Sequence, residues 1–193
     1  MKTRNTSAPV DRLLATADEL FYAEGIRSVG IDRILAESKV AKSTLYAHFR
    51  TKEDLVAAYL RRRGSTAQAR VIQAVDRHSK QPPSTRVLAA FDVFAELFAE
   101  PGYRGCPFAN ASAEYPHDAL VQGAIADDRR WLPALFADIL QEATSEETSH
   151  ALARALVQLY DGAVAAAHLD RRTDSAATAR ATARTLLAAH AIP

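Results

Sequence analysis

Apolar residues recur every three to four positions along most of the chain, which is the spacing of amphipathic helices. The first such stripe runs from Val10 to Phe21, with Ser7 able to cap its start and Gly25 able to end it. No stretch of the chain alternates convincingly between apolar and polar residues in the manner of a strand. The pattern therefore predicts an all-α fold.

Two short helices are predicted after this first one. Ile31, Ile34 and Leu35 indicate a helix that ends near Ser38, with Gly30 as a permissive N-cap. A third helix is predicted to begin near Lys42, because Leu45 and Phe49 fall on one face. Its remaining faces are polar and aromatic, so they are expected to face outward.

A long fourth helix is predicted from a capping box and an apolar stripe. The segment Thr51-Lys52-Glu53-Asp54 places a threonine at the N-cap and an acid three residues later. The stripe continues past Gly64 until Pro82-Pro83 forces a turn. Further helices are predicted over residues 84–100, 106–115, 118–143, 146–168 and 174–191.

Composition agrees with this helical reading. Alanine is the commonest residue, while the chain has only 7 glycines and 8 prolines, which favours helices. One cysteine cannot form an internal disulfide, and no apolar run approaches a membrane span. The amino-terminal residues are not followed by an apolar signal core, so we expect a cytoplasmic protein.

The net charge of +1 conceals an asymmetry between two parts of the chain. Residues 1–70 carry 13 Lys and Arg against 8 Asp and Glu, whereas residues 71–193 carry 11 against 15. A basic first part joined to a mildly acidic remainder is typical of a nucleic-acid-binding unit attached to a different unit. We expect a DNA-binding domain over residues 1–52 and a second helical domain over residues 53–193.

The segment from Ile31 to Lys52 predicts a helix-turn-helix, in which the second helix presents side chains to the DNA major groove. Lysine, serine and alanine can contact base edges or a thymine methyl, and hydroxyl, imidazole and ammonium groups can donate to phosphates. The candidate base contacts are Lys42, Ser43 and Ala47, with a phosphate contact as the alternative for Lys42. The candidate phosphate contacts are Thr44, Tyr46, His48 and Lys52. Periodicity and charge alone favour the interpretation that these helices only pack, because short helices with a polar face are common in helical proteins.

This segment closely resembles the amino-terminal domain of the tetracycline-repressor-like (TetR) family of bacterial transcription regulators. The resemblance spans about residues 10–60 and rests on four ordered motifs, Leu20-Phe21-Tyr22-Ala23-Glu24-Gly25, Ile31-Asp32-Arg33-Ile34-Leu35, Val40-Ala41-Lys42-Ser43-Thr44-Leu45-Tyr46-Ala47-His48-Phe49 and Lys52-Glu53-Asp54-Leu55. It implies that Leu45 and Phe49 are core residues and that the base and phosphate contacts are those named above. The chain departs from the family at the turn, where Ser38-Lys39 replaces Ala-Gly, so Lys39 is expected to adopt a positive φ.

Two charged features near the helix-turn-helix allow more than one interpretation. Asp32 lies where some relatives place a DNA contact, and its carboxylate could accept from a cytosine or interact with the dipole of its own helix. We favour the dipole. Arg61-Arg62-Arg63 is expected to be a solvated helix face, with contact to the DNA backbone as the alternative.

The rest of the chain resembles the family less specifically. Arg104-Gly105-Cys106-Pro107-Phe108-Ala109-Asn110-Ala111 and Glu114 are similar to a segment of one group of these regulators, whose carboxy-terminal helices form a ligand pocket and a dimer interface. Each aromatic residue taken alone is explained by a core. As a set they could line a cavity, with Asn110, Glu114, His117 or Asp161 as polar anchors. The expected ligand-binding residues are Phe91, Phe94, Phe98, Cys106, Phe108, Asn110, Glu114, Trp131 and Tyr160.

Other chemistry finds little support in the sequence. Cys106 follows Arg104 closely and could be a redox-sensitive thiolate, but a buried inert thiol is the favoured interpretation. The histidines show no paired metal-ligand spacing, so neither a metal nor another cofactor is expected. A glycine-rich phosphate loop, a nucleophile elbow and an H-E-x-x-H motif are all missing from the sequence, so we do not expect an enzyme.

The last two predicted helices carry small and apolar residues on shared faces. Packing within one chain and packing in a homodimer explain these faces about equally well, and the resemblance implies a four-helix interface. The residues expected there are Leu152, Leu156, Leu159, Ala163, Ala179, Ala183, Leu186 and Leu187. A homodimer would require a roughly palindromic operator, with recognition helices about 34–36 Å apart or a multiple of that distance.

Together these features predict a homodimeric transcription regulator, most simply a repressor that a small-molecule effector releases from a DNA operator. The helix from Lys52 to about Val75 is expected to connect pocket and DNA. The alternative is a helical protein-binding adaptor or enzyme in which the amino-terminal helices only pack.

Overall fold

The computed structural model describes residues 9–193, which form helices joined by turns and, within that range, no strand. The expected cap Ser7 lies outside the described residues. The chain folds into two compact units, which we call unit 1 and unit 2. Unit 1 consists of residues up to Arg63 together with Pro107–Ile125, and unit 2 consists of Gly64–Cys106 together with Ala126–Pro193.

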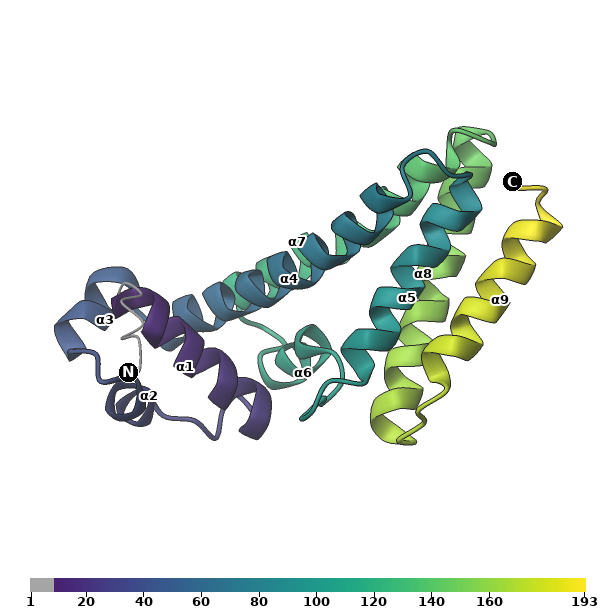
Figure 1. Cartoon of the computed structure of the whole chain (residues 1–193). Helices are drawn as coiled ribbons and strands as arrows, with labels where there is room; N and C mark the ends of the chain where they lie inside the picture. Colours follow the sequence, from purple (N-terminus) through teal and green to yellow (C-terminus); the bar gives the residue numbers. More distant parts are fainter. Residues whose placement is uncertain (1–8) are drawn as a thin grey trace, which may run out of the picture. The chain divides into compact units, whose positions relative to one another are not determined.

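Unit 1 contains four whole helices and the first parts of two long ones. The helices are α1 (Pro9–Glu24), α2 (Ile31–Ser38), α3 (Lys42–His48), the start of α4 (Lys52–Arg77), α6 (Pro107–Glu114) and the start of α7 (Ala119–Leu140). Figure 1 shows α1, α2 and α3 grouped together, and both α2 and α3 contact α1. Their packing buries Leu13, Phe21, Ile34 and Leu45, while Tyr59 of α4 lies edge-on to Phe21.

The local signals that the sequence predicted for unit 1 are present. Gly25 ends α1 with a φ of 93°, and its N–H donates to the Phe21 carbonyl. The capping box at α4 is complete, because the Asp54 N–H donates to Thr51 Oγ1 at 3.1 Å and the Thr51 N–H donates to Asp54 Oδ2 at 3.0 Å. The start of α4 is therefore fixed by its own sequence.

Unit 2 contains the remainder of α4 and α7 and three long helices. These are α5 (Pro83–Phe98), α8 (Glu146–Leu169) and α9 (Ser175–Ala189). α9 packs along α5 and along α8, as Figure 1 shows. The buried core includes Phe91 and Phe136, whose rings stack with centroids 6.2 Å apart.

This division by packing differs from the expected division between residues 52 and 53. The first turns of α4 bury Leu55, Val56 and Leu60, and they belong to unit 1 along with α6. Helix periodicity shows which face of α4 is apolar, but it does not show which helices cover that face. The functional boundary at residue 52 stays a prediction.

Candidate nucleic-acid interface

α2, a short turn and α3 form the predicted helix-turn-helix. Ile34 of α2 and Leu45 of α3 are buried. Lys39 in the turn has a φ of 55° and a ψ of 36°, which confirms the positive φ expected where the family has glycine. Phe49, expected in the core, is only half-buried, because it lies at the C-cap of α3 with extended backbone.

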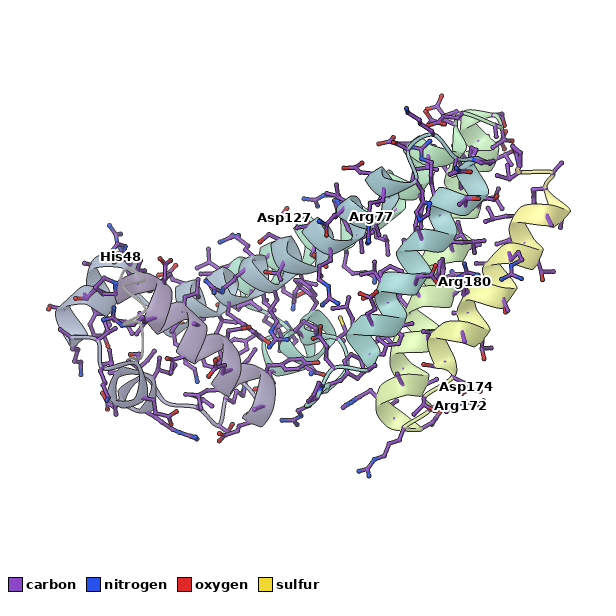
Figure 2. The ribbon with its side chains drawn as sticks, viewed as in Figure 1. His48, Arg77, Asp127, Arg172, Asp174 and Arg180 are labelled. Atoms are coloured by element: carbon purple, nitrogen blue, oxygen red, sulfur yellow. The ribbon has the colours of Figure 1, made fainter. Side chains whose placement is uncertain are left out.

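The remaining face of α3 is exposed. Lys42 and Ser43 in its first turn are exposed, and so are Ala47 and His48 one turn later. The Tyr46 side chain is 49% exposed, which is unusual for so large a ring. Figure 2 labels His48 at the end of this helix. Thr44 alone among the expected α3 contacts is half-buried.

This exposed face has the chemistry that base and phosphate recognition requires. An ammonium can donate to guanine, a serine hydroxyl can donate or accept at a base edge, and an alanine methyl can contact the methyl of thymine. The Tyr46 hydroxyl and the His48 ring nitrogens can donate to phosphate oxygens. The anchor of this face is Leu45, which is 1% exposed and holds α3 against α1.

Asp32 and Lys42 lie at the starts of α2 and α3 and approach each other. The Asp32 carboxylate is 3.7 Å from Lys42 Nζ, and both side chains are largely exposed. A pair as exposed as this contributes little to stability. It does place a carboxylate beside the lysine that we expect to read a base.

Lys52, a predicted phosphate contact, has a contact within unit 1. Its Nζ donates to the Ile26 carbonyl at 2.6 Å and lies 5.8 Å from the centroid of the Phe21 ring. Burial lowers the pKa of Lys52, and the nearby charges of Glu114 and Glu53 oppose this effect. The ammonium is therefore engaged within unit 1, and we do not propose it as a phosphate contact.

The run Arg61-Arg62-Arg63 in α4 does not form a uniform solvated face. The Arg63 guanidinium lies 3.7 Å from the Tyr22 ring centroid and pairs with Asp18, so it joins α4 to α1. Arg61 and Arg62 are exposed. The expectation of a solvated face therefore holds for these two positions only.

The residues expected to bind a ligand fall into both units. Unit 2 holds an aromatic cluster in which Tyr160 of α8 lies against Phe94 and Phe98 of α5, with ring centroids 4.3 and 6.4 Å apart. Phe91 and Trp131 belong to the same packed core, and Cys106 is half-buried. The others, Phe108, Asn110 and Glu114, lie on α6 in unit 1.

Two of the residues expected to be polar anchors for a ligand, Glu114 and Asp161, have hydrogen-bond partners within the chain. Both carboxylate oxygens of Glu114 accept hydrogen bonds from the backbone between α1 and α2, so we do not propose Glu114 as a ligand anchor. Asp161 pairs with Arg129 through two hydrogen bonds of 2.7 and 2.8 Å. His117 is exposed in the turn before α7.

Two ionisable groups in unit 2 have pKa values that burial raises. Burial raises the pKa of Tyr160 well above its ordinary value, and the nearby Cys106, Tyr103 and Asp128 add to the effect. The Asp128 carboxylate accepts a hydrogen bond of 3.0 Å from Gln68 Nε2. Neither residue was predicted as part of a site. The pKa of Asp128 is raised by burial, against the effects of Gln68 and Arg129.

Asp128→Asn is expected to stabilise the protein at neutral pH. Because the pKa of Asp128 is raised above the ordinary 3.8, the folded protein binds the Asp128 proton more tightly than the unfolded chain does. The free energy of unfolding therefore falls as the pH rises from 3.8 through the raised pKa. Asparagine keeps an oxygen for Gln68 and carries no charge. We expect a rise in Tm of roughly 2–4 °C at pH 7 and a flatter dependence on pH, measured by thermal unfolding. Identical pH profiles for the variant and the unmodified chain would contradict this account of Asp128.

The expected dimer residues pack mainly within one chain. Leu152, Leu156, Ala163, Ala179, Ala183 and Leu187 are each at most 6% exposed, and only Leu159 and Leu186 are half-buried. A side chain buried within its own chain has no surface to offer a partner, so these six are corrected to core residues between α5, α8 and α9. Figure 2 labels Arg180 on α9, where its guanidinium pairs with Asp92 of α5 at 2.7 Å and fastens the two helices.

The outward sides of α8 and α9 carry other small residues. Ala177, Ala181 and Ala188 form an exposed stripe along α9, and Ala151, Gly162 and Ala165 form one along α8. Leu169 at the end of α8 is 74% exposed. The turn between the two helices contains a pair between Arg172 and Asp174 at 2.6 Å, which Figure 2 labels.

Within residues 9–193, no three or more His, Cys, Asp or Glu side chains gather in a way that could hold a metal ion. Across the same range, every helix is too short or too polar to cross a bilayer.

Comparison with known proteins matches both parts of the chain to one family. Residues 13–59 match bacterial regulatory proteins of the tetR family, and residues 83–183 match the tetracyclin repressor-like carboxy-terminal domain. The transcriptional regulator AcuR of Cereibacter sphaeroides is 30% identical over 174 residues, which cover 84% of this chain and 77% of AcuR.

Solved structures give the same result. A TetR-family transcriptional regulator from Streptomyces coelicolor has a TM-score of 0.80 and 36% identity, covering 92% of this chain and 94% of that one. The regulatory protein TetR from Rhodobacter sphaeroides shares the fold, with a TM-score of 0.77 and 24% identity over 93% of this chain and 98% of its own. The chain belongs to the TetR family of DNA-binding bacterial transcriptional regulators.

Proposed function

We propose that the protein is a homodimeric repressor that occupies a roughly palindromic operator and leaves it when a small molecule binds. The observation that carries the DNA-binding part is the exposed face of α3, with Lys42, Ser43 and Tyr46 presented to solvent by the buried Leu45. Family membership supports the effector and the dimer, because TetR-family regulators usually have both. Operator binding would place the protein in the cytoplasm, and catalysis has no part in the proposal.

We assign the effector to the aromatic cluster of unit 2. Phe94, Phe98 and Tyr160 supply apolar surface, and the nearby Asp128, Gln68 and Cys106 supply polar groups. A few polar groups among aromatic rings are the usual composition of a small-molecule site. The effector would act by binding better to the state whose two α3 helices are wrongly spaced for the groove.

We assign the dimer interface to the outward stripes of α8 and α9. Ala177 and Ala181 on α9 and Gly162 on α8 are small enough for helices to approach closely. The exposed Leu169 adds apolar area at one end of this face. Two such pairs of helices would form the four-helix interface that the family usually has.

A gel-shift selection from genomic fragments tests the proposal. We expect the protein to retain a small set of fragments that share an inverted repeat, and we expect a metabolite extract to release at least one of them. Failure to prefer any fragment would contradict operator binding. Selective binding that no compound or extract weakens would contradict release by an effector and leave the DNA-binding regulator intact.

Tyr46→Phe is expected to weaken binding to every sequence alike. The variant removes only a hydroxyl, and a hydrogen bond to a phosphate oxygen is worth about 1–2 kcal/mol per half-site. Two half-sites give a loss on the order of thirtyfold or more in operator affinity. Because tyrosine is neutral, the dependence of affinity on salt is expected to keep its slope. Titrations of specific and unrelated duplexes at several salt concentrations check this, and a loss confined to particular base pairs would contradict it.

A further inference from the structure

The loop between α1 and α2 is held by residues from two distant parts of the chain. The Ile26 N–H donates to Glu114 Oε1 at 3.0 Å, and the Arg27 N–H donates to Glu114 Oε2 at 2.6 Å. On its other side, the Ile26 carbonyl accepts from Lys52 Nζ at 2.6 Å. The peptide groups that flank Ile26 are thus fixed by a carboxylate from α6 and an ammonium from α4.

The Arg27 side chain, which belongs to the loop, contacts the end of α6. Its Nε donates to the Glu114 carbonyl at 2.7 Å, and its guanidinium lies 5.4 Å from the centroid of the Tyr115 ring. Hydrogen bonds to an ionised carboxylate are roughly twice as strong as neutral ones. The join between α6 and the loop therefore consists of three hydrogen bonds and a cation–π contact, all within unit 1.

The shape of the loop depends on this join and on Gly25. Gly25 has a φ of 93°, which L side chains rarely adopt, and it lies directly against the Glu114 carboxylate. Val29, at the far end of the loop, is fully buried, and Gly30 is the N-cap of α2. The loop is therefore held at Ile26 and at the buried Val29, one residue before the N-cap of α2.

The position of Glu114 in the sequence gives this join a second consequence. The residues before α6, up to Cys106, and those after Ile125 belong to unit 2, so the segment that carries Glu114 is covalently tied to unit 2 at both ends. A change in unit 2 that moves Pro107 or Ile125 would therefore act on the segment whose carboxylate holds the α1–α2 loop. The route through α4, expected from the sequence, is therefore not the sole covalent connection between the two units.

We propose that Glu114 is a positioning residue for operator binding: its carboxylate holds the α1–α2 loop, and through it α2 and α3, in the arrangement that fits the groove. A movement of α6 that takes the Glu114 carboxylate away from the loop lowers operator affinity. The first statement stands on the contacts above, whereas the second rests on the proposed release by an effector.

The test compares Glu114→Gln and Glu114→Ala with the unmodified chain on two duplexes. One duplex is selected by the unmodified protein from a random pool, and the other is an unrelated sequence of equal length. Glu19→Gln, on the exposed side of α1, is the matched control for loss of one carboxylate. Affinities are measured by fluorescence anisotropy over a range of salt concentrations.

We expect each Glu114 variant to lose about tenfold or more in affinity for the selected duplex, because two charge-assisted hydrogen bonds are weakened or lost. Affinity for the unrelated duplex and the slope of affinity with salt are expected to stay unchanged, because Glu114 contacts no phosphate. Unchanged affinity for the selected duplex would overturn the proposal. An equal loss on both duplexes together with a large fall in Tm would also overturn it, since it would show a purely structural role.

Hydrogen exchange provides a second readout that needs no effector. Coupling is reciprocal, so if the Glu114 contact favours operator binding, operator binding also favours the state in which this contact is made. We expect the selected duplex to slow exchange at Ile26, at Arg27 and across Pro107–Glu114 in the unmodified protein, and the α6 response to disappear in Glu114→Gln. A response in α6 that Glu114→Gln leaves intact would overturn the proposal. Failure of the unmodified protein to select any duplex would instead count against the DNA-binding function itself.

Discussion

Ala181→Glu is expected to convert the dimer to a monomer and to lower operator affinity by about three orders of magnitude. Ala181 lies in the middle of the exposed stripe on α9, between Ala177 and Ala188. Around a twofold axis, the substitution would bring two like carboxylates into an interface without partners, which costs about 3–5 kcal/mol. A monomer binds only one half-site. It therefore lacks the increase in operator affinity that a dimer gains when its second subunit binds the second half-site in an intramolecular step.

Analytical ultracentrifugation and operator titration measure the two effects of Ala181→Glu. Ala95→Glu is the matched control, because Ala95 is also an exposed alanine of a unit 2 helix but lies on α5, outside the proposed interface. We expect the control to stay dimeric with unchanged affinity. A dimeric Ala181→Glu variant with normal operator affinity would show that the interface lies elsewhere.

Lys42→Ala is expected to relax the base preference of the protein at one position in each half-site. The lysine begins α3, its side chain is 64% exposed, and its Nζ lies 3.7 Å from the exposed carboxylate of Asp32. Loss of a base contact costs about 1–3 kcal/mol, and a dimer makes the contact twice, so we expect a loss of about 2–6 kcal/mol in operator affinity. The loss is expected to shrink when the contacted base pair is itself changed.

Competition with a set of singly substituted operators measures this preference. Lys80→Ala, at an exposed position in the turn after α4, removes the same charge far along the chain from α3 and is the control for general electrostatic attraction. If Lys42→Ala weakened all operators by the same factor, Lys42 would be a phosphate contact instead of a base contact. The control is expected to leave the ranking of operators unchanged.

Features governed by neighbouring residues could be predicted from the sequence. The periodicity around Leu45 and the capping box at Thr51 depend on residues within one or two turns, and both are present. The positive φ at Lys39 is also present, and it was predicted from the glycine that the TetR family has at this position. The exposed face of α3 follows directly from the burial of Leu45. The motifs shared with the TetR family supplied the function of that face.

Features that depend on tertiary contacts could not be predicted in this way. The contact between the Lys52 ammonium and the Ile26 carbonyl, 26 positions earlier, was not predicted. The hydrogen bond from the Ile26 N–H to Glu114, 88 positions away, was not predicted either. No local spacing rule links such partners, because their proximity results from how separate helices pack.

The faces of α8 and α9 illustrate a related limit. Periodicity identified the apolar faces at Leu156 and Ala183 correctly, but it did not distinguish packing within the chain from packing between chains. Burial resolves this, since both residues are 0% exposed in a single protomer. The small residues on the opposite sides, such as Gly162 and Ala181, were overlooked because each is unremarkable in an alanine-rich sequence.

We propose that α3 enters the major groove of each half of a twofold operator. Hydroxyl-radical footprinting on the duplex selected by the protein tests it directly. We predict two protected blocks related by an inverted repeat, on one side of the duplex and about 34–36 Å apart or a multiple of that distance. Lys42→Ala is expected to change which sequences are protected, without changing the spacing. A single protected block, or protection that is the same on any sequence, would contradict the claim.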